Sequence, residues 1–161
     1  MEFLTPILQR LPDTAKDIRL NLDSVLARSS LAPEDALGVA IAAAFAARSG
    51  ELVQALKSDA PAAEANAALT AAALMGMNNV WYPFVEMADD ADLTTARAEL
   101  RMNAYANHGG VDRASFELYA LAASIGGKRE FCVRSHYKHL RENGFTTQQV
   151  RAFRGQCRKA A

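Results

Sequence analysis

An alanine-rich run over residues 36–47 constrains the fold more than any other feature of this chain. It contains no charged side chain between Asp35 and Arg48, and half of the 161 residues are hydrophobic. Twelve apolar residues are too few for a membrane-spanning helix, which needs about 20. Alanine is also the strongest helix former. The run therefore predicts a helix buried inside a helical protein that has no membrane partner.

The remaining segments also carry helical patterns, and prolines and glycines mark the turns between them. No segment alternates as a strand would, and no repeat or linker divides the chain. We expect an all-α fold with seven or eight helices in one compact domain over residues 1–161. Pro83 should end one helix, Asp112 should cap another, and Thr146 with Gln149 should form a capping box. The expected helices cover approximately residues 13–27, 33–49, 52–57, 61–82, 93–106, 112–126, 129–142 and 146–159, with a polar connector at 88–92.

Charge and cysteine content exclude several functional classes. The formal net charge is zero, so neither nucleic acid nor a membrane surface is an expected partner. Residues 126–161 are nevertheless basic, with 9 basic and 2 acidic side chains, but they lack the interleaved aromatic residues typical of nucleic-acid sites. Two cysteines do not form a disulfide framework, and the first ten residues lack the layout of a signal peptide. We therefore expect a soluble cytoplasmic protein.

The segment around Cys132 carries the most chemistry. On a helix, Ser135, His136 and His139 follow Cys132 at i+3, i+4 and i+7, so all four share one face. A histidine one turn away can accept the proton of the thiol, and only the thiolate is a good nucleophile. Arg129, on the same side, can stabilise that thiolate.

Glu117 lies on the preceding expected helix, which is joined to the Cys132 helix through two glycines. An antiparallel pair would bring its carboxylate to His136. This arrangement predicts a relay in which Glu117 orients the imidazole, His136 takes a proton and Cys132 attacks. The alternative is that Cys132 is an apolar core residue and that the histidines lie on the surface.

A metal site is a weaker interpretation of the same residues. Cys132 and His136 could chelate an ion with one carboxylate, but structural zinc normally has four Cys or His ligands. His139 lies two turns from Cys132, about 10 Å along the helix axis, which is too far to share the ion. We expect neither a metal nor another cofactor.

Four blocks of sequence resemble a known family. They are residues 116–122 followed by Cys132 and His136, residues 11–22, residues 75–80 and residues 100–103. Taken in chain order, these four blocks look like those of the AhpD-type alkyl hydroperoxidases of the carboxymuconolactone decarboxylase-like superfamily. The resemblance covers approximately residues 8–150.

The resemblance implies an all-helical homotrimer that reduces alkyl hydroperoxides through a Cys-x-x-Cys pair. It also implies that the protein helps to regenerate an AhpC-type peroxiredoxin and takes electrons from a lipoyl-type dithiol. Glu117 and His136 match the relay residues of the family. Cys132 matches the second cysteine, which becomes a sulfenic acid.

The chain departs from the family pattern at functional positions. Arg129 stands where the first cysteine is expected, and Phe131 stands where the family often has a histidine. A sulfenic acid at Cys132 would need Cys157, a thiol of another subunit or an external thiol to resolve it. Two alternatives therefore stay open: a non-catalytic helical relative, and a thiol-independent decarboxylase-type enzyme of the same superfamily.

Overall fold

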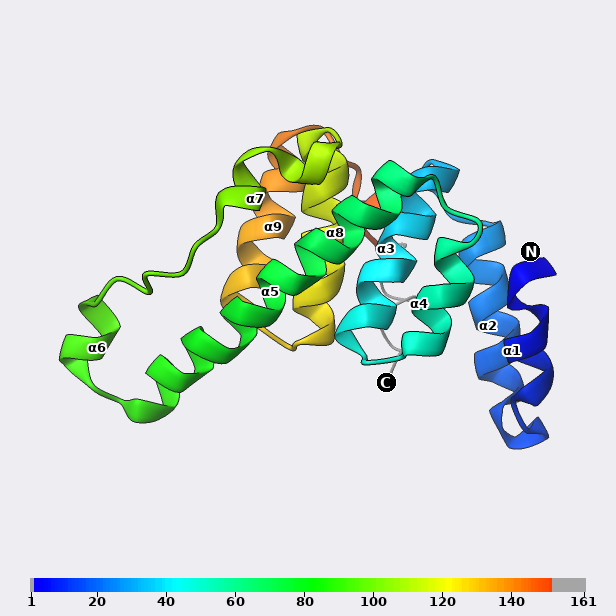
Figure 1. Ribbon diagram of the computed structural model, residues 1–161, viewed down its shortest axis with the longest axis horizontal. Helices are drawn as coiled ribbons and strands as arrows, with labels where there is room; N and C mark the ends of the chain where they lie inside the picture. The colour runs from blue at the N-terminus through cyan, green and yellow to red at the C-terminus, as the bar shows by residue number, and fades with distance from the viewer. Residues whose placement is uncertain (1, 152–161) are drawn as a thin grey trace.

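Three long helices form the centre of the computed structural model, which describes residues 2–151 (Figure 1). They are α3 (Pro33–Ala46), α5 (Ala62–Ala88) and α8 (Arg113–Gly126), and each packs against the other two. A fourth helix, α9 (Glu130–Glu142), packs against α8. The apolar run expected to be buried lies in α3, where every residue from 38 to 44 is buried. Small alanine side chains let these helix backbones approach closely.

The all-α prediction is confirmed: residues 2–151 contain α-helices and 3₁₀-helices but no strand. The described residues hold ten α-helices, more than the seven or eight expected, because several short ones occur. In Figure 1, α1 and α2 lie at one end of the molecule and α6 at the other. No helix in residues 2–151 has the length and apolar character needed to cross a bilayer. The other elements are η1 (Glu2–Leu4), α1 (Thr5–Arg10), η2 (Asp13–Ala15), α2 (Lys16–Ala27), α4 (Gly50–Lys57), α6 (Ala91–Thr95), α7 (Asn103–Ala106), η3 (His108–Gly110) and α10 (Thr147–Arg151).

Helix α8 is buried on all sides over residues 115–124. It begins as expected at Asp112, whose carboxylate accepts hydrogen bonds from the backbone N–H of Ser115 at 3.0 Å and from its hydroxyl at 2.9 Å. Because α3, α5 and α9 surround α8, the polar side chains within residues 115–124 have little access to bulk water. The carboxylate of Glu117 is therefore held inside the protein.

The prediction that a helix ends before Pro83 is wrong, since α5 continues to Ala88. Proline has no N–H to donate to the preceding turn, but its fixed φ is compatible with a helix, and Pro83 is itself buried. Packing therefore compensates for the missing hydrogen bond. The helix ends at Asp89, which adopts a left-handed φ of 50°. The expected polar connector begins here, and Asp90 caps α6 by accepting from the backbone N–H groups of residues 92 and 93.

The single helix expected over residues 93–106 is also not present. Helix α6 ends after Thr95, where the hydroxyls of Thr94 and Thr95 bond to backbone carbonyls and Ala96 turns to an extended conformation. Local bonds of this kind compete with helix continuation. Residues 96–102 then run back as an irregular segment to the short helix α7 (Figure 1). This path brings α7 beside α5.

The C-terminal turns agree with the sequence pattern. Helix α9 ends at Asn143, and Gly144 has a φ of 89°. In the expected capping box, the side chain of Gln149 accepts from the N–H of Thr146 at 2.9 Å, and the hydroxyl of Thr146 accepts from the N–H of Gln149 at 3.1 Å. The rest of the helix expected over 146–159 lies outside the described residues, as does Cys157.

Close packing of α3 against α8 depends on Gly38 of α3. The ring of Tyr119 on α8 lies directly over this glycine, so a β-carbon at position 38 would overlap the ring. Tyr119 is fully buried, and its hydroxyl donates to Glu64 at 2.5 Å. Burial and this carboxylate raise the pKa of Tyr119, which keeps it a neutral donor.

We predict opposite effects on stability for two glycine-to-alanine substitutions. Gly38→Ala should lower the free energy of unfolding by about 1–3 kcal/mol, because the added methyl group overpacks the core against Tyr119. At Gly76, in α5, an added β-carbon would meet nothing within 4 Å. Gly76→Ala should therefore raise the free energy of unfolding by about 0.5–1 kcal/mol through helix propensity. Urea unfolding followed by circular dichroism measures both. Equal stabilisation by the two substitutions would contradict the proposed packing.

Candidate active site

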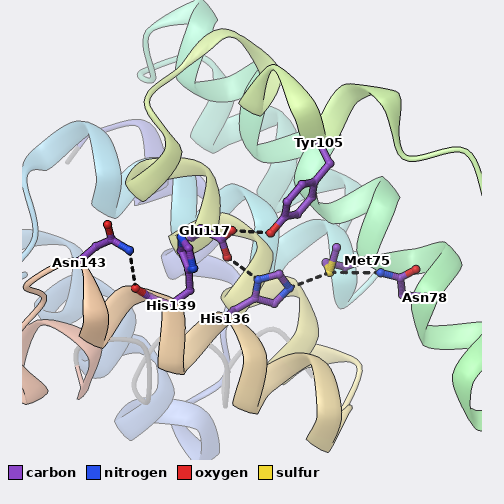
Figure 2. Close-up of polar contacts among 7 residues, drawn as sticks. All are labelled: Met75, Asn78, Tyr105, Glu117, His136, His139 and Asn143. Atoms are coloured by element: carbon purple, nitrogen blue, oxygen red, sulfur yellow. Dashed lines mark hydrogen bonds and ion pairs between the residues drawn. The ribbon is translucent and has the colours of Figure 1, made fainter.

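A buried carboxylate and an imidazole face each other across α8 and α9. Glu117 Oε2 lies 2.6 Å from Nδ1 of His136, and both side chains are buried (Figure 2). Two residues nineteen positions apart meet because the helices run antiparallel after a short turn at 127–129. The structure thus brings together two of the three residues that the sequence suggested as catalytic.

Tyr105 is a third member of this group, and the sequence did not reveal it. Its hydroxyl donates a hydrogen bond to Glu117 Oε1, and its ring packs edge-on against Phe116 with centroids 5.5 Å apart. Burial and the Glu117 carboxylate raise the pKa of Tyr105, so it remains a phenol that donates. Tyr105 lies on α7, in the segment expected to be one long helix, so neither motif nor spacing linked it to Glu117.

Hydrogen bonding decides the charge on Glu117. Burial alone would raise the pKa of this carboxyl, but the hydrogen bonds from His136 and Tyr105 outweigh it, and the pKa is lowered. Glu117 is therefore ionised at neutral pH. Because a carboxylate can only accept, the proton of a neutral His136 must lie on Nδ1. This leaves the lone pair of Nε2 free to act as a base.

The free side of the His136 ring faces Met75 of α5. Its Nε2 lies 3.2 Å from the Met75 sulfur, and Asn78 approaches the same sulfur at 3.9 Å (Figure 2). A thioether is only a weak hydrogen-bond acceptor. It can accept a hydrogen bond from Nε2 when the ring is protonated, but it does not act as a base towards the neutral ring. Met75 is itself buried. Its flexible side chain can also move to admit another group.

Cys132 lies one helical turn before His136 and is 5% exposed. Both residues, with Ser135, line one cavity of about 210 Å³. Within residues 2–151 no hydrogen bond joins the Cys132 thiol to the imidazole. The other residues that line this cavity are Met75, Asn78, Tyr82, Met102, Tyr105 and Phe131.

The surroundings of Cys132 favour a neutral thiol. Burial raises the pKa of Cys132, the positive charge of Arg129 lowers it in part, and the negative charge of Glu86 raises it again. The effect of Arg129 has the expected sign, but desolvation is larger. The thiol is thus protonated at neutral pH, and a base must remove its proton before it can attack.

His139, which the sequence also singled out, does not line this cavity. His139 lies near enough to Glu117 for its charge to lower the pKa of the carboxyl, but its Nε2 has no hydrogen-bond partner among the described residues.

Within residues 2–151, no three or more His, Cys, Asp or Glu side chains form a cluster that could hold a metal ion.

Comparison with known proteins identifies the family. The model of the carboxymuconolactone decarboxylase family matches residues 91–158, which include Glu117, Cys132 and His136. Several similar proteins are named alkyl hydroperoxide reductase AhpD. The protein from Rhodospirillum centenum is 44% identical over 145 residues, covering 88% of this chain and 77% of the relative.

Two further relatives with this name agree in extent. The protein from Maricaulis maris is 42% identical over 146 residues, covering 88% of this chain and 84% of the relative. The protein from Brucella canis is 39% identical over 147 residues, with coverage of 89% and 83%. Identity at this level over most of both chains confirms the resemblance that the sequence blocks indicated. The chain therefore belongs to the AhpD family of carboxymuconolactone decarboxylase-like proteins.

Proposed function

We propose that this protein is a thiol peroxidase that reduces small alkyl hydroperoxides at Cys132. The observation that carries the proposal is the buried Glu117–His136 pair, whose imidazole lines the same cavity as the Cys132 thiol. Glu117 holds the proton on Nδ1, so the other ring nitrogen can serve as the base. These are the groups that an activated cysteine nucleophile requires.

The proposed reaction conserves atoms and charge. His136 Nε2 takes the proton of the Cys132 thiol, after the flexible Met75 side chain has moved aside. The thiolate sulfur attacks the terminal oxygen of the hydroperoxide, the O–O bond breaks, and the alkoxide receives the proton from the imidazolium. The products are an alcohol and a sulfenic acid on Cys132.

The cavity suits a small substrate. Its volume of about 210 Å³ is below the range of about 300–1,000 Å³ typical of larger ligand sites. The thioethers of Met75 and Met102 supply an apolar lining, and the rings of Tyr82 and Phe131 stack beside it with centroids 5.7 Å apart. A short alkyl hydroperoxide fits these dimensions.

An external dithiol is the proposed reductant. With an arginine at position 129, the sulfenic acid has no cysteine three residues away with which to condense. One thiol of the donor would displace water to form a mixed disulfide, and its second thiol would release Cys132 while the donor closes to a disulfide. A lipoyl-type dithiol in the cytoplasm provides both groups, and we propose that the protein thereby supports an AhpC-type peroxiredoxin.

We also propose a homotrimer. In Figure 1 the C-terminal half of α5 projects from the helical body, with α6 at its tip. This arm exposes large apolar side chains, among them Val80 at 72% and Met87 at 80%, with Phe84 about half exposed. Contiguous exposed apolar surface of this kind marks an interaction site.

The neutral thiol favours one alternative, a thiol-independent decarboxylase-type activity. The Glu117–His136 pair is complete without Cys132, and no hydrogen bond ties the thiol to it in the described part of the chain. The pair could then take a proton from one carbon atom of a substrate and return it to another. Activity that survives the loss of Cys132 would favour this alternative.

The proposed roles predict a graded loss of peroxide turnover. Cys132→Ser should consume no tert-butyl hydroperoxide with dihydrolipoamide as reductant, and His136→Asn and Glu117→Gln should each lower the rate by about 10²-fold, as general base and orienting group. Lys138→Gln, an exposed neighbour on α9, is the matched control and should keep the wild-type rate. Equal turnover by Cys132→Ser would disprove the thiol mechanism.

The pH dependence of thiol alkylation tests the electrostatics of Cys132. In a Cys157→Ser background, the rate with iodoacetamide should rise with pH to a midpoint above the ordinary thiol value, because burial raises the pKa. Arg129→Gln removes a positive charge and should move the midpoint up. Glu86→Gln removes a negative charge and should move it down. A midpoint below the ordinary value, unmoved by either substitution, would contradict the assigned causes.

Light scattering after size exclusion tests the assembly. The wild-type mass should be about three times the chain mass of 17.4 kDa. Met87→Asp places a charge in the exposed apolar arm and should shift the mass towards the monomer. Leu20→Asp on α2, an exposed leucine far from the arm, is the control and should leave the mass unchanged. A monomeric wild-type protein would rule out the trimer.

A further inference from the structure

We propose that a second cavity binds a small organic acid, with its carboxylate between Arg48 and Arg129. This cavity, of about 650 Å³, lies between the turn from α3 to α4, the middle of α5 and the start of α9. It has none of its lining residues in common with the Cys132 cavity. Its volume is within the range typical of sites for small molecules.

Two unpaired guanidinium groups supply the charge. Within residues 2–151, neither Arg48 nor Arg129 forms an ion pair or a side-chain hydrogen bond, although both line the cavity. Arg48 adopts a left-handed φ of 59°, which is unfavourable for a residue with a β-carbon. Arginine forks match the geometry of a carboxylate. The guanidinium groups of Arg48 and Arg129 together favour an anion over a neutral ligand.

The N-terminus of α4 adds to this preference. Ser49 and Gly50 line the cavity, and the Ser49 side chain does not cap the helix. The acidic residue of the first turn, Glu51, is paired with Arg10 instead. The N–H groups of an uncapped first turn and the helix dipole both attract negative charge.

Two buried polar atoms in the wall lack partners. Asn79 Oδ1 and Arg129 Nε have no hydrogen-bond partner among the described residues. The Asn79 amide is pressed against Gly127, since a β-carbon at 127 would overlap it, and it therefore has little freedom to turn. An unsatisfied buried polar atom costs about 1–3 kcal/mol. Neither atom has surface open to the cavity, so they add polarity to its wall without contacting the ligand.

The other walls define the rest of the ligand. Phe45, Val53 and Val80 line the cavity with apolar surface. A carboxylic acid with a medium-length alkyl chain meets both demands: a carboxylate for the arginines and an apolar chain for these side chains. This is the ligand class that the cavity indicates.

Arg129 links this cavity to the thiol three residues further along α9. Burial raises the pKa of Cys132, and the charge of Arg129 partly offsets that rise. A bound carboxylate would neutralise this charge and make the thiol less acidic. Occupancy of the cavity should therefore slow alkylation of Cys132 at a fixed pH, although binding itself does not depend on peroxidase activity.

Calorimetric titration of the full chain tests the site with defined probes. We expect octanoate to bind at least tenfold more tightly than 1-octanol or inorganic phosphate. Arg129→Gln and Arg48→Gln should each weaken the binding of octanoate at least tenfold. Arg134→Gln, on the exposed face of the same helix and paired with Glu130, is the matched control and should bind normally.

Several outcomes would overturn the proposal. Absence of binding at millimolar octanoate, or equal affinity for 1-octanol, would exclude an acid site, and equal affinity for phosphate would exclude the organic class. If no probe binds and Arg129→Gln changes the oligomeric mass, the cavity is an interface between copies. Cys132→Ser should bind octanoate like the wild type, so a failure of the peroxidase mechanism leaves this test intact.

Discussion

The buried carboxylate of Glu117 is the constraint on which the candidate active site depends. An ionised group inside a helical core is costly unless hydrogen bonds replace the lost water. Here His136 on α9 and Tyr105 on α7 both donate to it, one to each oxygen. Two elements from separate parts of the chain, α7 and α9, are thereby held to α8. The same bonds keep Glu117 ionised and place the imidazole proton on the nitrogen that faces it.

Helix α5 separates the two cavities. Met75 and Asn78 line the cavity that contains Cys132, whereas Gly76 and Asn79 line the second one. Neighbouring positions on a helix point about 100° apart, so adjacent residues can line different cavities. The start of α9 repeats this division, since Arg129 lines one cavity and Cys132 the other. A change of charge in one cavity can therefore act on the thiol in the other.

Local patterns predicted those features that depend on local physics. Alanine content and the caps at Asp112 and Thr146 predicted the helical class and several helix ends, because these are settled within a few residues. The Glu117–His136 contact was also foreseeable, since a short turn leaves two helices little choice but to pack antiparallel. The continuation of α5 beyond Pro83 could not be foreseen, because the burial of this proline depends on segments distant in the sequence.

The missed features all require contacts between segments with no periodic relation. Tyr105 reaches Glu117 only because residues 96–102 leave the helical path and return the chain to the core. The second cavity combines Arg48 and Asn79 with Arg129, which are far apart in the sequence. Spacing cannot reveal such groups.

The arginine at position 129 changes what the thiol can do. An arginine cannot condense with a sulfenic acid, so it cannot perform the resolving step expected of a cysteine at this position. Its effect on the thiol is electrostatic, since its charge partly offsets the rise in the Cys132 pKa that burial causes. A neutral, buried thiol reacts slowly with oxidants in general, because the thiolate is the reactive form. Restricting attack to molecules that enter the cavity beside His136 would then limit overoxidation, which matters most where no neighbouring thiol can protect the sulfenic acid.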